Sequence, residues 1–341
     1  MIRVLVVDDS RVLTKIVSRI LERDPAIQVA GTAENGREAI EKVESLKPDV
    51  VTLDIEMPVM NGIEALKHIM ANNPVPVIML STLTRDHADI TMDALAIGAC
   101  DFVTKDFSNT LLADKQLELI NKVKDVSKNR ARLLLKGFIH QEHHPVSLSP
   151  RSALKREILS IGASTGGPPA LQYILSHLPK EFPVPIAIAQ HMPRLFTQSF
   201  AERLDKISSL TVKEAEDKED LKAGVVLIAP GDTHLAIRRG RRQATVELVK
   251  DDKYVYRPSV DLLMSTTAEA YGQSSFGVIL TGMGADGLVG MKELKSKGGY
   301  VIAQNEETCV VYGMPKAVVN AHLADVVLPI ERIPEEIVKI L

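Results

Sequence analysis

Short apolar runs alternate with amphipathic stretches along the first 123 residues. Runs such as Ile2–Val7 and Asp49–Leu53 are mostly apolar and are typical of strands buried on both faces. Stretches such as Val12–Glu22 and Gly36–Leu46 carry apolar residues at helical spacing. This alternation predicts a parallel sheet with helices on both faces. The expected strands are 2–7, 28–33, 49–53, 75–80 and 101–103, and the expected helices are 12–22, 36–46, 62–71, 88–97 and 111–123.

The alternation stops in residues 124–153, which are basic and contain Pro145, Pro150 and several serines. This composition is typical of a linker, and a helical start of the linker is the alternative for its first residues. Its His-Gln-Glu-His-His run at 140–144 lacks the spacing of a zinc-binding helix, so we interpret the run as solvated chain. A second alternation fills residues 154–341 and predicts a doubly wound, mostly parallel α/β domain with an antiparallel hairpin near Arg239–Gly240.

Composition narrows the class of protein. A length of 341 residues fits two domains, and an apolar fraction of 45% is enough for two cores. The net charge of −3 gives no general attraction to nucleic acid or anionic membranes. Two distant cysteines, Cys100 and Cys309, form neither a disulfide framework nor a zinc cluster. No apolar run is as long as a membrane span of about 20 residues, so we expect a cytoplasmic protein without a signal peptide.

Polar side chains follow four expected strands of the first domain: Asp8 and Asp9, then Asp54, Ser81 and Lys105. Ligands in open α/β sheets bind at the carboxyl ends of strands, so these side chains are expected to meet. Adjacent carboxylates repel one another unless a cation is present, and oxygen ligands suit Mg²⁺. A carboxylate there can accept a phosphoryl group, whose oxygens a lysine and a hydroxyl can bind. Helix capping by the first two aspartates is the alternative, but it does not explain the whole set.

The stretches VLVVDDS at 4–10 and DVVTLDIEMPVMNGIEAL at 49–66 resemble the receiver domain of bacterial response regulators, and the resemblance covers residues 1–123. It implies a flavodoxin-like fold and phosphorylation of Asp54. It also implies supporting roles, namely Mg²⁺ binding by Asp8, Asp9 and Asp54, phosphate binding by Lys105, and switching by Ser81 and Phe102. Receivers usually carry proline after this lysine, whereas this chain has Asp106, which leaves the conformation of that loop open.

The second domain does not fit a DNA-binding output domain. It is too long and too rich in strands for a helix-turn-helix module. Its basic patch, Arg238–Arg242, is short and lies at the expected hairpin, so we interpret it as a solvated turn.

The segment ILSIGASTGGPPAL at 158–171 runs from a strand through a glycine-rich turn into a helix. It lacks the lysine of a P-loop and the spacing of G-x-S-x-G. Ser164 stands where a nucleophile can use the helix N-terminus to stabilise negative charge. Taken alone, the segment favours the alternative that Ser164 caps the following helix.

A serine nucleophile needs a base, and His191 ends the apolar run PIAIAQ at the same sheet edge. Of the other histidines, His234 follows a turn sequence and is expected to be structural, and His177 is expected at a solvent-exposed helix end. The rest lie in the linker or at expected surface positions: His68, His87, His140, His143, His144 and His322.

A G-x-G-x-x-G pattern spans Gly282–Gly287, and Glu306 lies near the spacing of a dinucleotide-binding fold. However, Asp286 would put negative charge inside the pyrophosphate cradle, and the pattern does not open a new domain. A carboxylate at this edge can instead orient the imidazole of His191 and stabilise its protonated form.

Four stretches resemble the chemotaxis protein-glutamate methylesterase family (CheB): STGG at 164–167, QHMP at 190–193, TGMGADG at 281–287 and YGMP at 312–315. Receiver, linker and catalytic domain also follow that family's order, so the resemblance covers essentially the whole chain. It implies a catalytic triad of Ser164, His191 and Asp286, with oxyanion contacts from Met283 and Thr165.

The same resemblance implies a reaction and its control. The expected reaction is hydrolysis of γ-glutamyl methyl esters on chemoreceptors, with deamidation of receptor glutamines and no cofactor. The expected phosphodonor is a chemotaxis histidine kinase, and phosphorylation of Asp54 is expected to relieve masking of the active site by the receiver. Two other classes compete with this interpretation: a dinucleotide oxidoreductase and a receiver-linked binding protein without catalysis.

Overall fold

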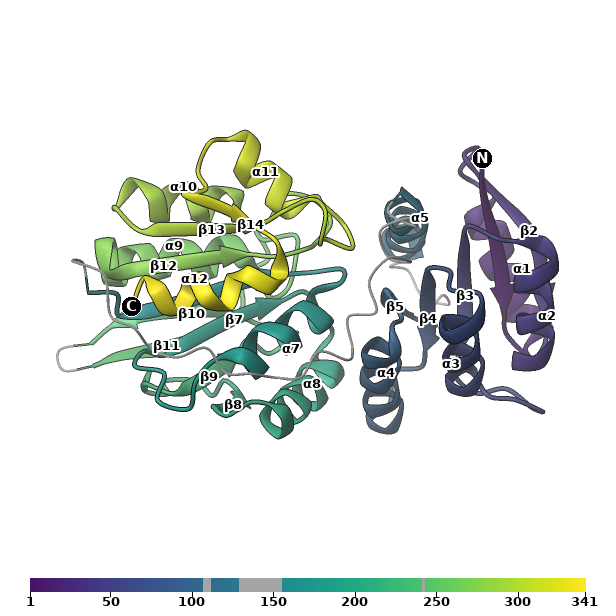
Figure 1. The fold of residues 1–341 in the computed structure, drawn as a ribbon, viewed down its shortest axis with the longest axis horizontal. Helices are drawn as coiled ribbons and strands as arrows, with labels where there is room; N and C mark the ends of the chain where they lie inside the picture. The colour runs from purple at the N-terminus through teal and green to yellow at the C-terminus, as the bar shows by residue number, and fades with distance from the viewer. Residues whose placement is uncertain (107–111, 129–154, 241–242) are drawn as a thin grey trace. The chain divides into compact units, whose positions relative to one another are not determined.

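The structure is a computed structural model. It describes residues 1–106, 112–128, 155–240 and 243–341 of the protein. Its chain divides into two compact units, residues 1–141 and 142–341. Figure 1 colours the first unit purple to blue and the second teal to yellow. Within the described residues, no helix has the length and apolar character that a membrane span requires.

The first unit is built on a five-stranded parallel sheet with the order β2-β1-β3-β4-β5. Strands β3, β4 and β5 are buried throughout, which explains their continuous apolar runs. The expected flavodoxin-like sheet is therefore confirmed. The strands are Ile2–Val7, Ile27–Ala33, Val50–Asp54, Val77–Ser81 and Asp101–Thr104, and the helices α1 to α5 are Arg11–Leu21, Gly36–Leu46, Gly62–Asn72, Arg85–Ile97 and Leu112–Lys128.

Helix α5 continues beyond residue 123, where the clear helical pattern ends. It ends at Lys128, so residues 124–128 form the helical start that was one alternative for the linker. Leu119, Val123 and Val126 are all fully buried at helical spacing, and this apolar stripe carries the helix past residue 123.

The second unit is built on a seven-stranded parallel sheet with the order β14-β13-β12-β6-β7-β9-β8. A separate two-stranded antiparallel sheet is formed by β10 and β11, as the sequence predicted. The strands β6 to β14 are Ile158–Ala163, Ile186–Gln190, Thr211–Glu214, Val225–Ile228, His234–Arg239, Ala244–Val249, Ser275–Ile279, Tyr300–Gln304 and Val326–Leu328. The helices α7 to α12 are Gly167–His177, Arg194–Ile207, Val260–Tyr271, Leu288–Ser296, Met314–Asn320 and Ile333–Lys339.

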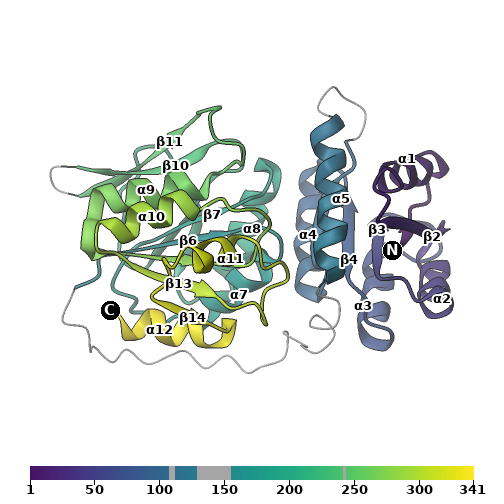
Figure 2. The ribbon, with the colours of Figure 1, turned by 90° about the horizontal axis from the view of Figure 1, so that it is seen from above.

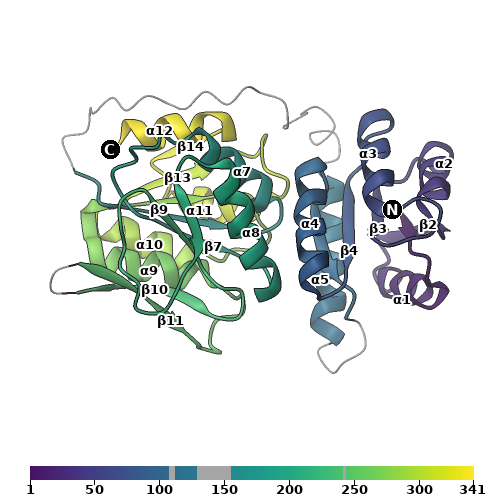
Figure 3. The ribbon, with the colours of Figure 1, turned by 90° about the horizontal axis from the view of Figure 1, so that it is seen from below.

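Helices cover both faces of this sheet. Helices α9 and α10 lie on one face and α7, α8 and α12 on the other, as Figures 2 and 3 show. The β10–β11 hairpin packs outside α9 through Leu235, Ile237 and Val246, which belong to the same buried cluster as Leu263 and Ala268 of that helix.

The order of the strands places a topological switch point at one edge of the sheet. From β6 the chain first builds β7, β8 and β9 on one side and then returns to build β12, β13 and β14 on the other. The carboxyl ends of β6 and β12 therefore flank a topological switch point, where open α/β sheets bind their ligands.

Candidate functional site

The aspartates of the first unit gather as the sequence predicted. Asp8 and Asp9 follow β1, and Asp54 ends the neighbouring strand β3. One carboxylate oxygen from each of the three lies within 4.8 Å of the others. The capping alternative is wrong, because Ser10 is the residue whose side chain caps α1. Three carboxylate oxygens in one place suit a hard divalent cation such as Mg²⁺, so the donor set fits that ion.

Lys105 comes from the end of β5 and joins the same group. Its ammonium lies 2.9 Å from Asp8 Oδ2 and 2.5 Å from Asp54 Oδ1. Its backbone N–H donates to the carbonyl of Ser81 at 2.8 Å, so Asp106 in place of proline does not displace the lysine. Burial raises the pKa of Asp54, Lys105 opposes this rise, and the charge of Asp8 adds to it.

Ser81 and Phe102 lie on β4 and β5 beside this group. The Ser81 hydroxyl donates to the carbonyl of Thr82 at 3.3 Å and accepts from the Thr91 hydroxyl at 2.9 Å. Phe102 is buried, and the ammonium of Lys122 lies 5.6 Å from the centre of its ring. The structure thus places the hydroxyl on the strand next to β3, which ends in Asp54, and the aromatic ring in the interior.

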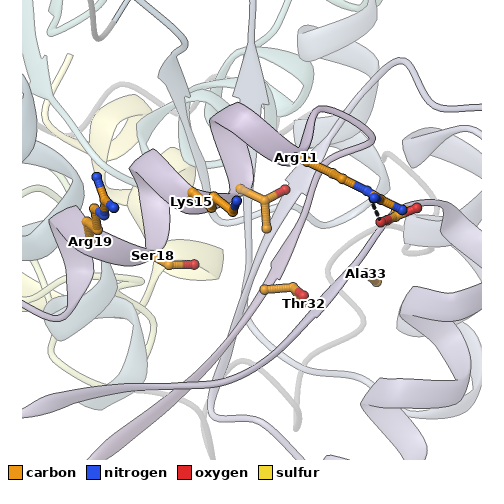
Figure 4. Close-up of a pocket in the computed structure, with 8 residues that line it drawn as sticks. Arg11, Lys15, Ser18, Arg19, Thr32 and Ala33 are labelled. Atoms are coloured by element: carbon orange, nitrogen blue, oxygen red, sulfur yellow. Dashed lines mark hydrogen bonds and ion pairs between the residues drawn. The ribbon is translucent and has the colours of Figure 1, made fainter.

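Hollows lie on the surface of the first unit, formed by its described residues. One, of about 300 Å³, is on the outer face of α1 and is lined by Arg11, Lys15 and Arg19 (Figure 4). Its Arg11 pairs with Glu34 at 2.9 Å, and the aspartates that follow β1 and β3 do not line it. The other, of about 740 Å³, is lined by Asp9 and residues 55–58, so it lies beside the three aspartates.

Ser164 follows β6 at the switch point of the second unit. Its N–H donates to the carbonyl of Thr281 at 3.0 Å, and its own carbonyl accepts from the N–H of Gly167 at 2.7 Å. Gly166, in the left-handed region with φ of 77°, is the N-cap of α7, and no side chain caps that helix. The alternative that Ser164 caps α7 is therefore wrong, and its hydroxyl does not serve the helix.

His191 follows β7, the neighbour of β6. The register pairs Ala163 with Gln190, so Ser164 and His191 are the next residues on strands that lie about 4.8 Å apart. The imidazole Nε2 lies 2.7 Å from Asp286 Oδ2. Its Nδ1 is buried and has no hydrogen-bond partner among the described residues. Tyr256 stacks on the ring, with 4.7 Å between ring centres and 7° between planes.

Asp286 is held by the N-terminus of α9. Its Oδ2 accepts from the N–H of Val260 at 2.8 Å, and its Oδ1 accepts from the N–H of Asp261 at 2.9 Å. Burial alone would raise the pKa of this carboxyl, but the hydrogen bond and charge of His191, together with those N–H groups, bring the pKa below its ordinary value. Asp286 is therefore ionised at the pH at which a histidine side chain ordinarily changes its protonation state.

The loop Gly282–Gly287 is not a pyrophosphate cradle. Helix α10 follows the loop, and the side chain of Asp261 occupies its N-terminus, with Oδ1 accepting from Gly287 and Gly290 at 2.9 Å each. A helix N-terminus already occupied by a carboxylate has no donors left for a phosphate. The dinucleotide interpretation is therefore wrong, and Glu306 lies in the exposed loop after β13.

The expected oxyanion residues lie next to Ser164. Thr165 is buried, and its carbonyl accepts from the Thr281 hydroxyl at 2.9 Å. Met283 is in the loop after β12, where Gly282 passes so close that an added Cβ would lie 2.8 Å from Ser164 Cβ. A glycine at 282 thus allows the loop with Met283 to run against Ser164.

His234 agrees with the structural role expected of it. It is the first residue of β10, its Nδ1 accepts from Ser259 N and its Nε2 lies 3.0 Å from the carbonyl of Asp251. The ring is buried, and burial lowers its pKa. His177 is buried rather than exposed, since it stacks on Tyr173 one turn earlier in α7.

The basic patch at the hairpin and the histidine-rich run in the linker are the other features that the sequence singled out. Arg238 pairs with Glu247, and Arg239 donates to the carbonyl of Ala270, so both bind the protein itself. The histidine-rich run at 140–144 lies outside the described residues.

Sequence patterns missed Tyr256 and Asp261. Tyr256 precedes α9 and Asp261 lies in its first turn, and the only signal there was the capping serine, Ser259. Their contacts join parts of the chain that are distant in sequence, so local pattern could not reveal them.

Comparison with known proteins identifies a family for each of the two units. A family model described as CheB methylesterase matches residues 159–337, and one described as response regulator receiver domain matches residues 4–116. The chain is 46% identical to a protein-glutamate methylesterase/protein-glutamine glutaminase of Oleidesulfovibrio alaskensis, over 99% of this chain and 98% of that protein. It is 47% identical to one of Thermotoga maritima, also over 99% and 98%.

A solved structure matches the second unit. It is the CheB methylesterase catalytic domain of Thermotoga maritima, which is 49% identical and has a TM-score of 0.54. The match covers 55% of this chain and all of the crystallised domain.

Proposed function

The chain belongs to the CheB methylesterase family and carries a receiver domain, and from this premise we propose that it is a phosphorylation-activated esterase of chemoreceptors. Its substrates are γ-glutamyl methyl esters, and by the names of its relatives it also deamidates glutamines. The observation that carries this proposal is the 2.7 Å contact between His191 and Asp286 on the strand end next to Ser164.

In this mechanism Ser164 is the nucleophile and His191 the general base. Because Asp286 occupies Nε2, the atom that takes the serine proton is Nδ1, which has no other partner in the described part of the chain. Asp286 stabilises the imidazolium that forms. The serine oxygen attacks the ester carbonyl, His191 returns the proton to the leaving methanol, and water then hydrolyses the acyl-enzyme. For a glutamine substrate the same proton goes to ammonia.

Backbone N–H groups of Thr165 and Met283 stabilise the oxyanion in this proposal. Both residues flank Ser164, one in the glycine-rich turn and the other in the loop that passes it. Donors held by the backbone keep their orientation during the reaction, and loss of one such donor typically reduces the rate by about 10²–10³.

The receiver is proposed to control the esterase through Asp54. Asp8, Asp9 and Asp54 would hold Mg²⁺, which supplies charge neutralisation during phosphoryl transfer. Lys105, now paired with Asp8 and Asp54, is placed to bind phosphoryl oxygens on Asp54. A chemotaxis histidine kinase is the proposed donor.

Substitution Asp54→Asn is expected to abolish stimulation by a phosphodonor. Asparagine has nearly the same shape but forms no acyl phosphate. The measurement is methanol release from receptors carrying tritiated methyl esters, with and without acetyl phosphate and Mg²⁺. Equal stimulation of the variant and the wild type would contradict phosphorylation at this residue.

We further propose that the unphosphorylated receiver restrains the catalytic domain, to which residues 124–153 link it. Deletion of residues 1–150 is then expected to raise basal methanol release. A relative's catalytic domain has been crystallised by itself, which supports folding of the shortened chain. Circular dichroism provides the control for folding. A folded fragment that is no faster than the unphosphorylated full-length chain would exclude this restraint.

A further inference from the structure

Gln190 is the last residue of β7, and its side chain is only 2% exposed. It directly precedes His191, the proposed base. Across the sheet it pairs with Ala163, which directly precedes Ser164, the proposed nucleophile. No catalytic role was expected of it from the sequence.

The side-chain amide of Gln190 binds the backbone at both of those strand ends. Its Nε2 donates to the carbonyl of Ser164 at 3.0 Å and to the carbonyl of His191 at 3.1 Å. The opposite amide orientation would put Oε1 against two carbonyl oxygens, so the contacts themselves fix which atom is the donor. One side chain thus ties the backbone of residue 164 to that of residue 191.

The surroundings leave this amide little freedom. Its Oε1 is buried without a hydrogen-bond partner in the described residues, which is a costly arrangement. That oxygen lies against Gly167, where an added Cβ would come within 1.9 Å of it. The second glycine of the STGG turn therefore provides the space that the Gln190 side chain occupies.

The other backbone groups of Ser164 and His191 are also held. The N–H of Ser164 donates to Thr281 O at 3.0 Å and the N–H of His191 to Ala163 O at 3.1 Å. Those bonds tie each residue to the sheet and its loops, whereas the Gln190 amide ties the two residues to each other. Catalysis is sensitive to such spacing, since a misplacement of about 1 Å can reduce the rate about 10²-fold.

We propose that Gln190 is a positioning residue that sets the distance between Ser164 and His191. This inference rests on the proposed function, because it takes Ser164 as the nucleophile. It goes beyond the triad by assigning the spacing of nucleophile and base to a buried amide that touches neither substrate nor reacting atoms.

The test uses the full-length chain with Gln190→Met, which keeps the length of the side chain and removes both donors. A second variant, Gln190→Glu, keeps the shape and places acceptor oxygens against the two carbonyls. Ser160→Ala is the matched control, since it removes a buried 2.8 Å hydrogen bond to Thr267 within the same unit. Thermal unfolding identifies the variants that fold.

Two readouts are compared. One is kcat and KM for methanol release from tritiated methyl-esterified receptors. The other is the rate at which a fluorophosphonate labels Ser164, with Ser164→Ala as the unlabelled reference. We expect both Gln190 variants to lose about 10- to 100-fold in kcat and in labelling rate, with KM changed by less than about threefold. The Ser160→Ala control is expected to lose thermal stability alone.

A folded Gln190→Met or Gln190→Glu variant that is labelled and turns over at the wild-type rate would overturn the inference. So would a loss confined to thermal stability, as in the control. If the wild type is labelled at Ser164 but releases no methanol, the proposed substrate is wrong, and the labelling rates still decide the role of Gln190.

Discussion

Ser164→Ala is expected to reduce methanol release from methylated receptors by about 10⁴-fold or more, because the reaction then lacks its nucleophile. The substitution removes a hydroxyl that neither caps α7 nor supports the turn, whose bonds to Thr281 and Gly167 are made by the backbone. The fold is therefore expected to be retained. The measurement is the initial rate of methanol release in the presence of acetyl phosphate and Mg²⁺.

Phosphorylation provides the internal control for this variant. Asp54 lies in the other compact unit, so Ser164→Ala is expected to incorporate phosphate from acetyl phosphate as the wild type does. A variant that loses both activities has a folding defect and is uninformative about the triad, which thermal unfolding would show independently. An alanine variant with turnover within tenfold of the wild type would remove Ser164 from the mechanism.

Much of this architecture could be predicted from the sequence because polar residues interrupt the apolar runs at strand ends. Asp54 ends a strand that is buried throughout, and Ser164 and His191 directly follow two others. In parallel sheets such positions converge on one edge whatever the details of packing. The alternation of strands and helices therefore predicted the fold of each unit and the position of Ser164 and His191 at neighbouring strand ends.

The local pattern could not predict which groups support the proposed triad. Asp286 and Asp261 each bind backbone N–H groups of the other's segment, so that α9 and α10 exchange capping carboxylates. Such an exchange depends on how two helices pack, and helical periodicity says nothing of it. The same holds for Tyr256, whose ring reaches His191 from a segment without a predicted element.

The burial of His177 and the end of helix α5 were also not predicted from the sequence, and each has a cause in the local packing. His177 was expected to be exposed because it ends a helix, but stacking on Tyr173 buries it. The end of helix α5 stayed open in the sequence because its last turns are mostly polar, although Val126 continues the buried stripe. In both cases burial against the rest of the protein outweighs the polar character of the neighbouring residues.

Asp286→Asn is expected to reduce kcat by about 10²–10⁴-fold, although it changes only one atom. Both carboxylate oxygens accept backbone N–H groups, Oδ2 from Val260 and Oδ1 from Asp261. In either orientation the amide nitrogen of asparagine would therefore face a backbone donor. The variant also removes the negative charge that stabilises the protonated imidazole of His191.

The measurement is the rate of methanol release together with thermal unfolding. A small loss of thermal stability is expected as well, because a carboxylate at a helix N-terminus is typically worth about 0.3–1 kcal/mol and up to about 2 kcal/mol when partly buried. Asp251→Asn is the matched control, since that carboxylate pairs with Lys253 at the surface and does not bind His191. The control is expected to keep wild-type turnover. If Asp286→Asn turned over within tenfold of the control, the carboxylate would be a helix cap and not a member of the triad.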